Sequence, residues 1–195
     1  MILILMGVCG CGKSSVGQAL AKDLECSFVD ADDLHPETNK DKMSRGVPLT
    51  DDDRLPWLRA VNREMNRLHT PGSSVVVACS ALKASYRHIL VSNLDQDDSH
   101  TRSHSGVQQD SETISVSSDI CFVHLDGSFE LIASRMSTRH DHFMPTSLLQ
   151  SQFAALERPT HPERFITVDV SPGVDETVRS IRSQLRALAH AQAVL

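Results

Sequence analysis

Residues 2–14 read ILILMGVCGCGKS and join an apolar run to a glycine-rich loop. The run has the pattern of a strand that is buried on both faces of a parallel sheet. The loop, residues 7–14, fits the pattern G-x-x-x-x-G-K-[ST] without a gap, and apolar residues at 16, 20 and 24 indicate an amphipathic helix behind it. Backbone N–H groups and the helix N-terminus bind phosphate oxygens in such a loop, which predicts a nucleotide site.

The side chains of this loop have specific expected tasks. Lys13 is expected to reach the β- and γ-phosphates and so to act in catalysis, and Ser14 is expected to bind Mg²⁺. The predicted nucleotide contacts are Gly7, Val8, Cys9, Gly10, Cys11, Gly12, Lys13, Ser14 and Ser15.

Working outward, short apolar runs alternate with amphipathic stretches along the chain. Further strands are predicted at residues 27–30, 75–79, 120–125 and 165–170, with helices between them. Thr50 and Asp53 have the spacing of a capping box and predict the start of one of these helices. The alternation predicts an α/β protein with a five-stranded parallel sheet and helices on both faces. Residues 95–118 are polar and are predicted to be an insertion in a single domain, residues 1–195.

Composition excludes several classes of function. The 195 residues carry 19 Lys+Arg against 25 Asp+Glu, a formal net charge of −6. An acidic protein lacks the basic footprint that nucleic acids and anionic membranes require, so neither partner is expected. No apolar run approaches the roughly 20 residues of a membrane helix. The chain has an odd number of cysteines, 5, and no C-x-x-C pair, which indicates free thiols and a cytoplasmic protein.

Two carboxylates follow the second predicted strand, in the segment DADDLHP at residues 30–36. Asp30 and Asp32 are two residues apart and would project the same way from an extended chain, toward the phosphate loop. Asp30 could then hold the hydration shell of Mg²⁺, and Asp32 could accept the proton of an attacking hydroxyl. The alternative is an acidic turn that caps the helix predicted near Pro36.

At these residues the sequence resembles the gluconokinases, P-loop small-molecule kinases that are related to shikimate kinase. The resemblance covers nearly the whole chain apart from the polar insertion. The matching segments are MGVCGCGKSS (6–15), DADDLHP (30–36), Asn39 with Lys42-Met43, GVPLTDDDRLPWL (46–58), ACSALKASYR (78–87), RHDHFMP (139–145) and LLQSQFAALERP (148–159). The resemblance implies a P-loop kinase fold with a mobile lid at about residues 135–145. It also implies ATP- and Mg²⁺-dependent phosphorylation of the 6-hydroxyl of D-gluconate, giving 6-phospho-D-gluconate.

The resemblance also implies roles for particular residues. Arg54 is the candidate partner for the gluconate carboxylate, because guanidinium binds carboxylate bidentately. Arg139 is expected to stabilise charge on the transferring phosphoryl group, and Arg135 to stack on the adenine near Pro172; the exchange of these two roles is the alternative. The remaining substrate-binding candidates are Asp32, His35, Lys83, Arg87 and Gln152. For Arg87 and Gln152, a solvated position on a helix is the alternative.

The sequence departs from the family pattern at two places, and two alternative functions remain. Cys9 and Cys11 stand where the family has serines, and their position beside a helix N-terminus predicts lowered thiol pKa values. The alternative is that both thiols point away from the cleft and are inert. The polar insertion is the other departure. Another sugar-acid or shikimate-like kinase, or a nucleotide-binding module without catalysis, would use the same phosphate loop. Related kinases are often dimers, so a homodimer is an expected assembly.

Overall fold

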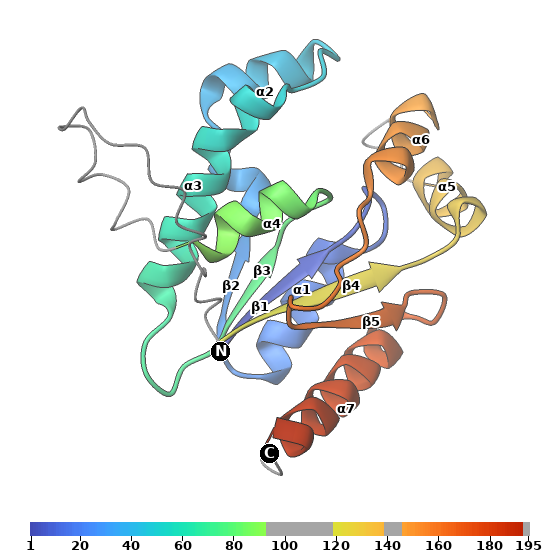
Figure 1. Ribbon diagram of the computed structural model, residues 1–195. Helices are drawn as coiled ribbons and strands as arrows, with labels where there is room; N and C mark the ends of the chain where they lie inside the picture. Colours follow the sequence, from blue (N-terminus) through green and yellow to red (C-terminus); the bar gives the residue numbers. More distant parts are fainter. Residues whose placement is uncertain (93–118, 139–145, 193–195) are drawn as a thin grey trace, which may run out of the picture.

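The computed structural model describes residues 1–92, 119–138 and 146–192, and Figure 1 shows the arrangement of their helices and strands. Five parallel strands form one sheet in the order β2-β3-β1-β4-β5, which confirms the predicted fold class. The strands are β1 (Ile2–Met6), β2 (Ser27–Asp30), β3 (Val75–Ala78), β4 (Ile120–Asp126) and β5 (Phe165–Asp169). The predicted insertion and most of the predicted lid lie outside the described residues.

Helices cover both faces of this sheet. They are α1 (Lys13–Asp23), α2 (Glu37–Ser44), α3 (Asp51–Leu68), α4 (Ala84–Val91), α5 (Phe129–Ser137), α6 (Thr146–Ala155) and α7 (Val174–Gln192), with a short 3-10 helix η1 (Ala31–Leu34) after β2. Among the described helices, none is both long enough and apolar enough to cross a membrane.

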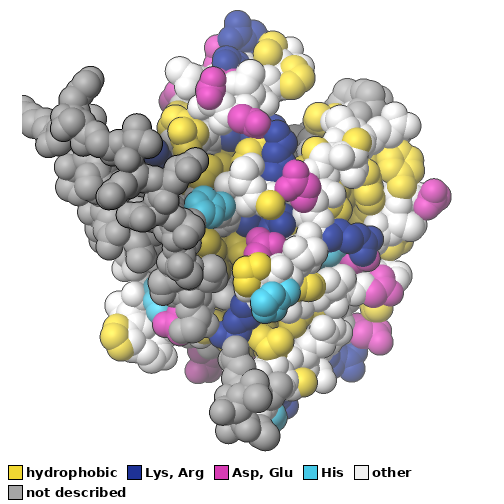
Figure 2. Space-filling model, viewed as in Figure 1, with side chains coloured by type: hydrophobic (Ala, Val, Ile, Leu, Met, Phe, Trp, Pro, Cys, Tyr) yellow, Lys and Arg dark blue, Asp and Glu magenta, His cyan; other side chains and the backbone are white. Residues whose placement is uncertain are grey.

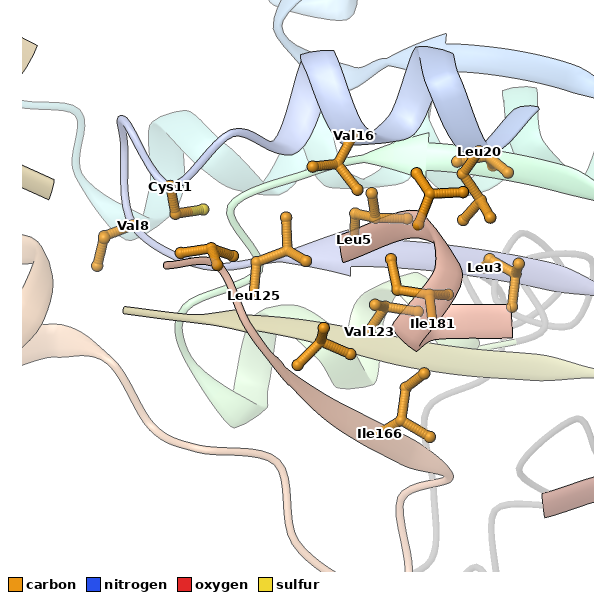
Figure 3. Close-up of a cluster of buried hydrophobic side chains, with 14 of the residues drawn as sticks. Leu3, Leu5, Val8, Cys11, Val16, Leu20, Val123, Leu125, Ile166 and Ile181 are labelled. Carbon is orange, nitrogen blue, oxygen red and sulfur yellow. The ribbon is translucent and has the colours of Figure 1, made fainter. Parts of the chain in front are cut away.

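The side chains of β1 point alternately to the two faces of the sheet, and so contribute to two separate core layers. Leu3 and Leu5 face a cluster that includes Val16 of α1 and Ile181 of α7 (Figure 3). Ile2, Ile4 and Met6 face the other cluster, which α3 and α4 supply. Because β1 is hydrogen-bonded to β3 and β4 on its two sides, the loop that follows it leaves the centre of the sheet. Ligands of open α/β sheets bind outside the carboxyl ends of the strands, where this loop lies.

Helix α3 begins with the predicted capping box. The Thr50 side chain accepts a hydrogen bond from the Asp53 backbone N–H at 3.2 Å, and Asp53 accepts one from the Thr50 N–H at 3.0 Å. These bonds satisfy N–H groups that the first turn of a helix leaves unpaired. They also fix the start of the helix that carries Arg54.

Candidate active site

The phosphate loop connects β1 to α1 and bends at its glycines. Gly7, Gly10 and Gly12 all have positive φ angles, of 142°, 82° and 99°. A Cβ at Gly10 would lie 2.7 Å from Cγ of Met136, so a larger residue there would force the Met136 side chain to move. Lys13 donates from Nζ to the carbonyl oxygens of Gly7 at 3.1 Å and Val8 at 3.0 Å. The predicted phosphate loop is therefore formed, with Lys13 folded back along it.

The predicted magnesium residues, Ser14 and Asp30, come together at the start of α1. Ser14 Oγ donates to Oδ2 of Asp30 at 2.6 Å, and Oδ1 of Asp30 accepts from the Asp32 N–H at 3.2 Å. Mg²⁺ is bound through one or two protein oxygens together with substrate phosphates and water, and this donor set fits that chemistry. Among the described residues, no group of three or more His, Cys, Asp or Glu could hold a metal alone.

Asp32 lies beside Asp30, but its backbone conformation differs from the one expected. The sequence predicted both on extended chain, whereas the structure places Asp32 in η1, capped by Asp30. Asp32 is open to solvent, yet partial desolvation in the cleft raises its pKa, and the charge of Asp30 adds to this effect. The charge of Lys13 opposes the shift. A carboxylate with a raised pKa is a better proton acceptor.

Arg54 and Lys83 flank the ring of Tyr86. Arg54 Cζ lies 5.8 Å from the ring centroid and Lys83 Nζ lies 5.2 Å from it. Lys83 Nζ also donates to both carboxylate oxygens of Asp51, at 2.8 and 2.9 Å, and the Tyr86 hydroxyl donates to the same carboxylate. The charge of Lys83 is thus neutralised within the protein. In the described part of the chain, the Arg54 guanidinium forms no hydrogen bond or ion pair.

His35 is buried beside this group. Its ring stacks on Trp57, with centroids 4.2 Å apart and planes 14° apart. Burial lowers the pKa of His35 to about 4, and the positive charges of Arg54 and Lys40 add to the shift. His35 is therefore neutral near pH 7. Figure 2 shows basic and acidic side chains gathered between the surfaces of α2 and α6.

Arg87 does not belong to this cleft, and its predicted contact with substrate is corrected. The side chain is 1% exposed, which also excludes a solvated position. Its guanidinium donates to Glu163 at 2.6 and 3.0 Å and to the carbonyl oxygens of Glu157 at 2.8 Å and Ala81 at 3.2 Å. These hydrogen bonds hold the segment before β5 against α4. Arg87 is therefore a structural ion-pair residue.

Gln152 of α6 contacts the phosphate loop. Its Oε1 accepts a hydrogen bond from the Cys9 backbone N–H at 2.6 Å. The side chain is half-buried, so it does not occupy the solvated position that was the alternative. The contact places Gln152 on the nucleotide side of the cleft.

A cavity of about 320 Å³ lies on the α7 side of the loop. It is lined by Gly10, Gly12, Arg135, Pro172 and Val174, among others. Arg135 donates from Nη2 to the Val170 carbonyl oxygen at 2.6 Å, which fixes its guanidinium at the rim. The two residues predicted to meet adenine are thus beside one cavity. Arg139, predicted for the phosphoryl group, lies outside the described residues.

Cys11 differs from the expectation for its thiol. Its side chain is 1% exposed and packs into the core cluster near Leu125 (Figure 3). Burial raises the pKa of Cys11, and the opposing charge of Lys13 is the smaller effect. The predicted lowering is wrong for Cys11, because its side chain is buried in the core and desolvation disfavours the thiolate.

Sequence reasoning missed the partners that hold these residues. Asp51 stood in the DDD run next to Arg54, but the sequence gives no sign that it pairs with Lys83 and Tyr86. Glu163 lies 76 positions from Arg87. Asn39 belongs to the family pattern, and its Nδ2 lies 3.4 Å from Nδ1 of His35; the spacing of four residues was the available signal.

The comparisons with known proteins identify the family. The family model described as shikimate kinase matches residues 9–164. A probable gluconokinase of Xenopus tropicalis is 45% identical, over 95% of this chain and 93% of its own. The crystal structure of a gluconokinase from Sinorhizobium meliloti 1021 has a TM-score of 0.76 and 41% identity, and the match covers 98% of this chain and 95% of the other.

The chain belongs to the gluconokinases, within the shikimate kinase family. A probable gluconokinase of Rattus norvegicus is also 45% identical, over 95% of this chain and 97% of its own. The resemblance read from the motifs is confirmed. Kinase family membership makes ATP the phosphoryl donor and disfavours a module without catalysis.

Proposed function

We propose that this gluconokinase-family chain transfers the γ-phosphoryl group of ATP to the 6-hydroxyl of D-gluconate, giving 6-phospho-D-gluconate and ADP. The observation that carries the proposal is the Arg54 guanidinium, which has no hydrogen-bond or ion-pair partner among the described residues, together with the family to which the chain belongs. The names of the relatives indicate the substrate. The geometry supplies a cation for its carboxylate.

The pairing of three other cations favours Arg54. Lys42 pairs with Asp53 at 2.6 Å, Lys83 pairs with Asp51 and Arg87 pairs with Glu163. A carboxylate that binds Lys42, Lys83 or Arg87 must displace an existing ion pair, whereas binding Arg54 displaces none among the described residues. Guanidinium also matches the carboxylate with two parallel hydrogen bonds.

In the proposed reaction, the carboxylate of Asp32 accepts the proton of the 6-hydroxyl. The oxygen forms a bond to the γ-phosphorus while the bond from that phosphorus to the bridging oxygen breaks, and ADP leaves. Lys13 swings from its carbonyl partners to the phosphates and neutralises charge there. By family resemblance, Arg139 is proposed to add positive charge to the transferring group.

Ser14 and Asp30 are the proposed residues that hold Mg²⁺, which offsets the charge of the β- and γ-phosphates when bound. The remaining proposed nucleotide contacts follow the loop from Gly7 to Ser15 and the cavity beside Arg135 and Pro172. His35 is proposed to contact a substrate hydroxyl. The cytoplasmic location and the homodimer stay predictions.

Measuring ADP release with several acceptors tests the proposal. D-Gluconate, shikimate and D-sorbitol are compared, because D-sorbitol keeps a chain of hydroxyls and lacks the carboxylate. We expect D-gluconate to be preferred, with kcat/KM for D-sorbitol lower by about tenfold to 100-fold, the value of hydrogen bonds to a charged group. Equal turnover of D-gluconate and D-sorbitol would contradict the role of Arg54. Preference for shikimate would establish the alternative kinase.

A further inference from the structure

His35 is held in a fixed orientation by its two neighbours. One face stacks on Trp57, whose Nε1 donates to the Ala31 carbonyl oxygen at 2.6 Å. On its edge, Nδ1 lies 3.4 Å from Nδ2 of Asn39. His35 is 6% exposed and Asn39 is 2% exposed. Neither ring nor amide is therefore free to rotate in solvent.

The orientation of the Asn39 amide follows from a second contact. Its Nδ2 lies 2.8 Å from the backbone carbonyl oxygen of Asp53. A carbonyl oxygen only accepts hydrogen bonds, so the amino group, and not the amide oxygen, must occupy that position. The amino group has two hydrogens and no acceptor. Its second hydrogen is directed at Nδ1 of His35, which must then be the unprotonated nitrogen of the ring.

The other ring nitrogen is available to a ligand. No described residue forms a hydrogen bond with Nε2 of His35. This atom is also not fully buried, so a ligand can reach it. The charged groups that act on the ring are Arg54 of α3 and Lys40 of α2, both positive. Burial and these charges keep the imidazole neutral near pH 7. A neutral ring with Nδ1 bare carries its one proton on Nε2.

We propose that Asn39 is a positioning residue that fixes His35 as the Nε2–H tautomer, so that His35 meets a substrate hydroxyl as a hydrogen-bond donor. The role of His35 toward substrate rests on the proposed function, but the tautomer does not. The arrangement selects an acceptor atom at one place along the sugar acid. It also keeps a second positive charge away from Arg54, which leaves Arg54 as the partner for the carboxylate.

Nitrogen-15 NMR of the full chain tests the tautomer without reference to activity. Two-bond ¹H–¹⁵N correlations distinguish the Nε2–H, Nδ1–H and doubly protonated forms of imidazole. The His35 signals are assigned by their loss in His35→Gln. At pH 7 we expect the Nε2–H form alone. A dominant Nδ1–H form, a mixture of the two, or a protonated ring would overturn the proposal.

Replacing Asn39 by Asp tests the positioning role. A carboxylate beside Nδ1 draws a proton to that nitrogen and leaves Nε2 without one, or leaves the ring charged. We expect the NMR pattern to change accordingly and the KM for D-gluconate to rise about threefold to tenfold, the value of one hydrogen bond. The KM for ATP should stay within about twofold.

Asn66→Asp is the matched control, because it makes the same change at an exposed position of α3. It should leave both KM values and the His35 signals unchanged. An unchanged His35 tautomer in Asn39→Asp, or equal rises in both KM values, would contradict the positioning role. If D-gluconate is not a substrate, the NMR measurements still decide the tautomer.

Discussion

Replacing Arg87 by Met tests whether this residue holds the fold or binds substrate. Met keeps most of the apolar stem and removes the guanidinium. The change leaves the Glu163 carboxylate, 24% exposed, without its ion-pair partner. It also removes the donor to the carbonyl oxygens of Ala81 and Glu157. The loss therefore falls on stability.

The expected cost follows from the burial of the pair. Removing one partner of a buried ion pair costs about 3–5 kcal/mol, because the other charge is left uncompensated. Since Glu163 retains some contact with water, we expect about 3 kcal/mol. For a protein of this size each kcal/mol lowers the Tm by about 2–4 °C, so the Tm should fall by about 6–12 °C.

Thermal and urea unfolding of the wild type and the variant measure this cost. Arg158→Met is the control, because Arg158 is 65% exposed and pairs with Asp126 at 3.1 Å. Exposed pairs contribute about 0–1 kcal/mol, so its Tm should change by less than about 4 °C. At a temperature where both variants are folded, Arg87→Met should keep the wild-type KM for D-gluconate. Equal effects of the two variants on Tm, or a large rise of that KM, would refute the reasoning.

Four further outcomes are expected. Arg54→Lys keeps the charge but loses the planar fork, so the KM for D-gluconate should rise much more than the KM for ATP; equal rises would point to folding or closure instead. Asp32→Asn should lower kcat by about 10²–10⁴ with little change in Tm, and near-normal turnover would exclude its role as the base. Gln152→Leu removes the acceptor of the Cys9 N–H and should raise the KM for ATP. A rise confined to the KM for D-gluconate would instead show that Gln152 contacts the sugar acid. The pKa of Asp53 is lowered to about 2, chiefly by its hydrogen bond from Lys42. The extra stability of the wild type over Asp53→Asn should therefore be present above about pH 4 and vanish as the pH falls toward 2. A constant difference in stability across that range would exclude this linkage.

The local parts of the site could be predicted from the sequence. The strand, the loop at residues 7–14 and helix α1 are contiguous, and the constraints on glycine and lysine act within a few residues. The capping box at Thr50 followed from spacing, and the position of Asp30 facing the phosphate loop followed from its place at the end of the second strand. The family motifs brought Arg54 and His35 to the same cleft.

The other parts depend on contacts between distant segments. Arg87 is in a long, specific motif, but its partner Glu163 comes from the chain before β5, which no periodicity relates to α4. Cys11 is beside a helix N-terminus, as predicted, but whether its side chain faces the phosphates or the core depends on the loop's backbone angles. For both residues the local motif could be predicted, whereas the direction of the side chain depends on contacts with distant segments.

The position of the new phosphate ester tests the central claim most directly. The protein is incubated with ATP, Mg²⁺ and D-gluconate, and the product is examined by ¹H–³¹P correlation NMR. The account predicts one product whose phosphorus couples to the two protons on carbon 6, formed in equal amount with ADP. Phosphorus coupled to any other carbon's proton, or ADP formed at the same rate without D-gluconate, would contradict it.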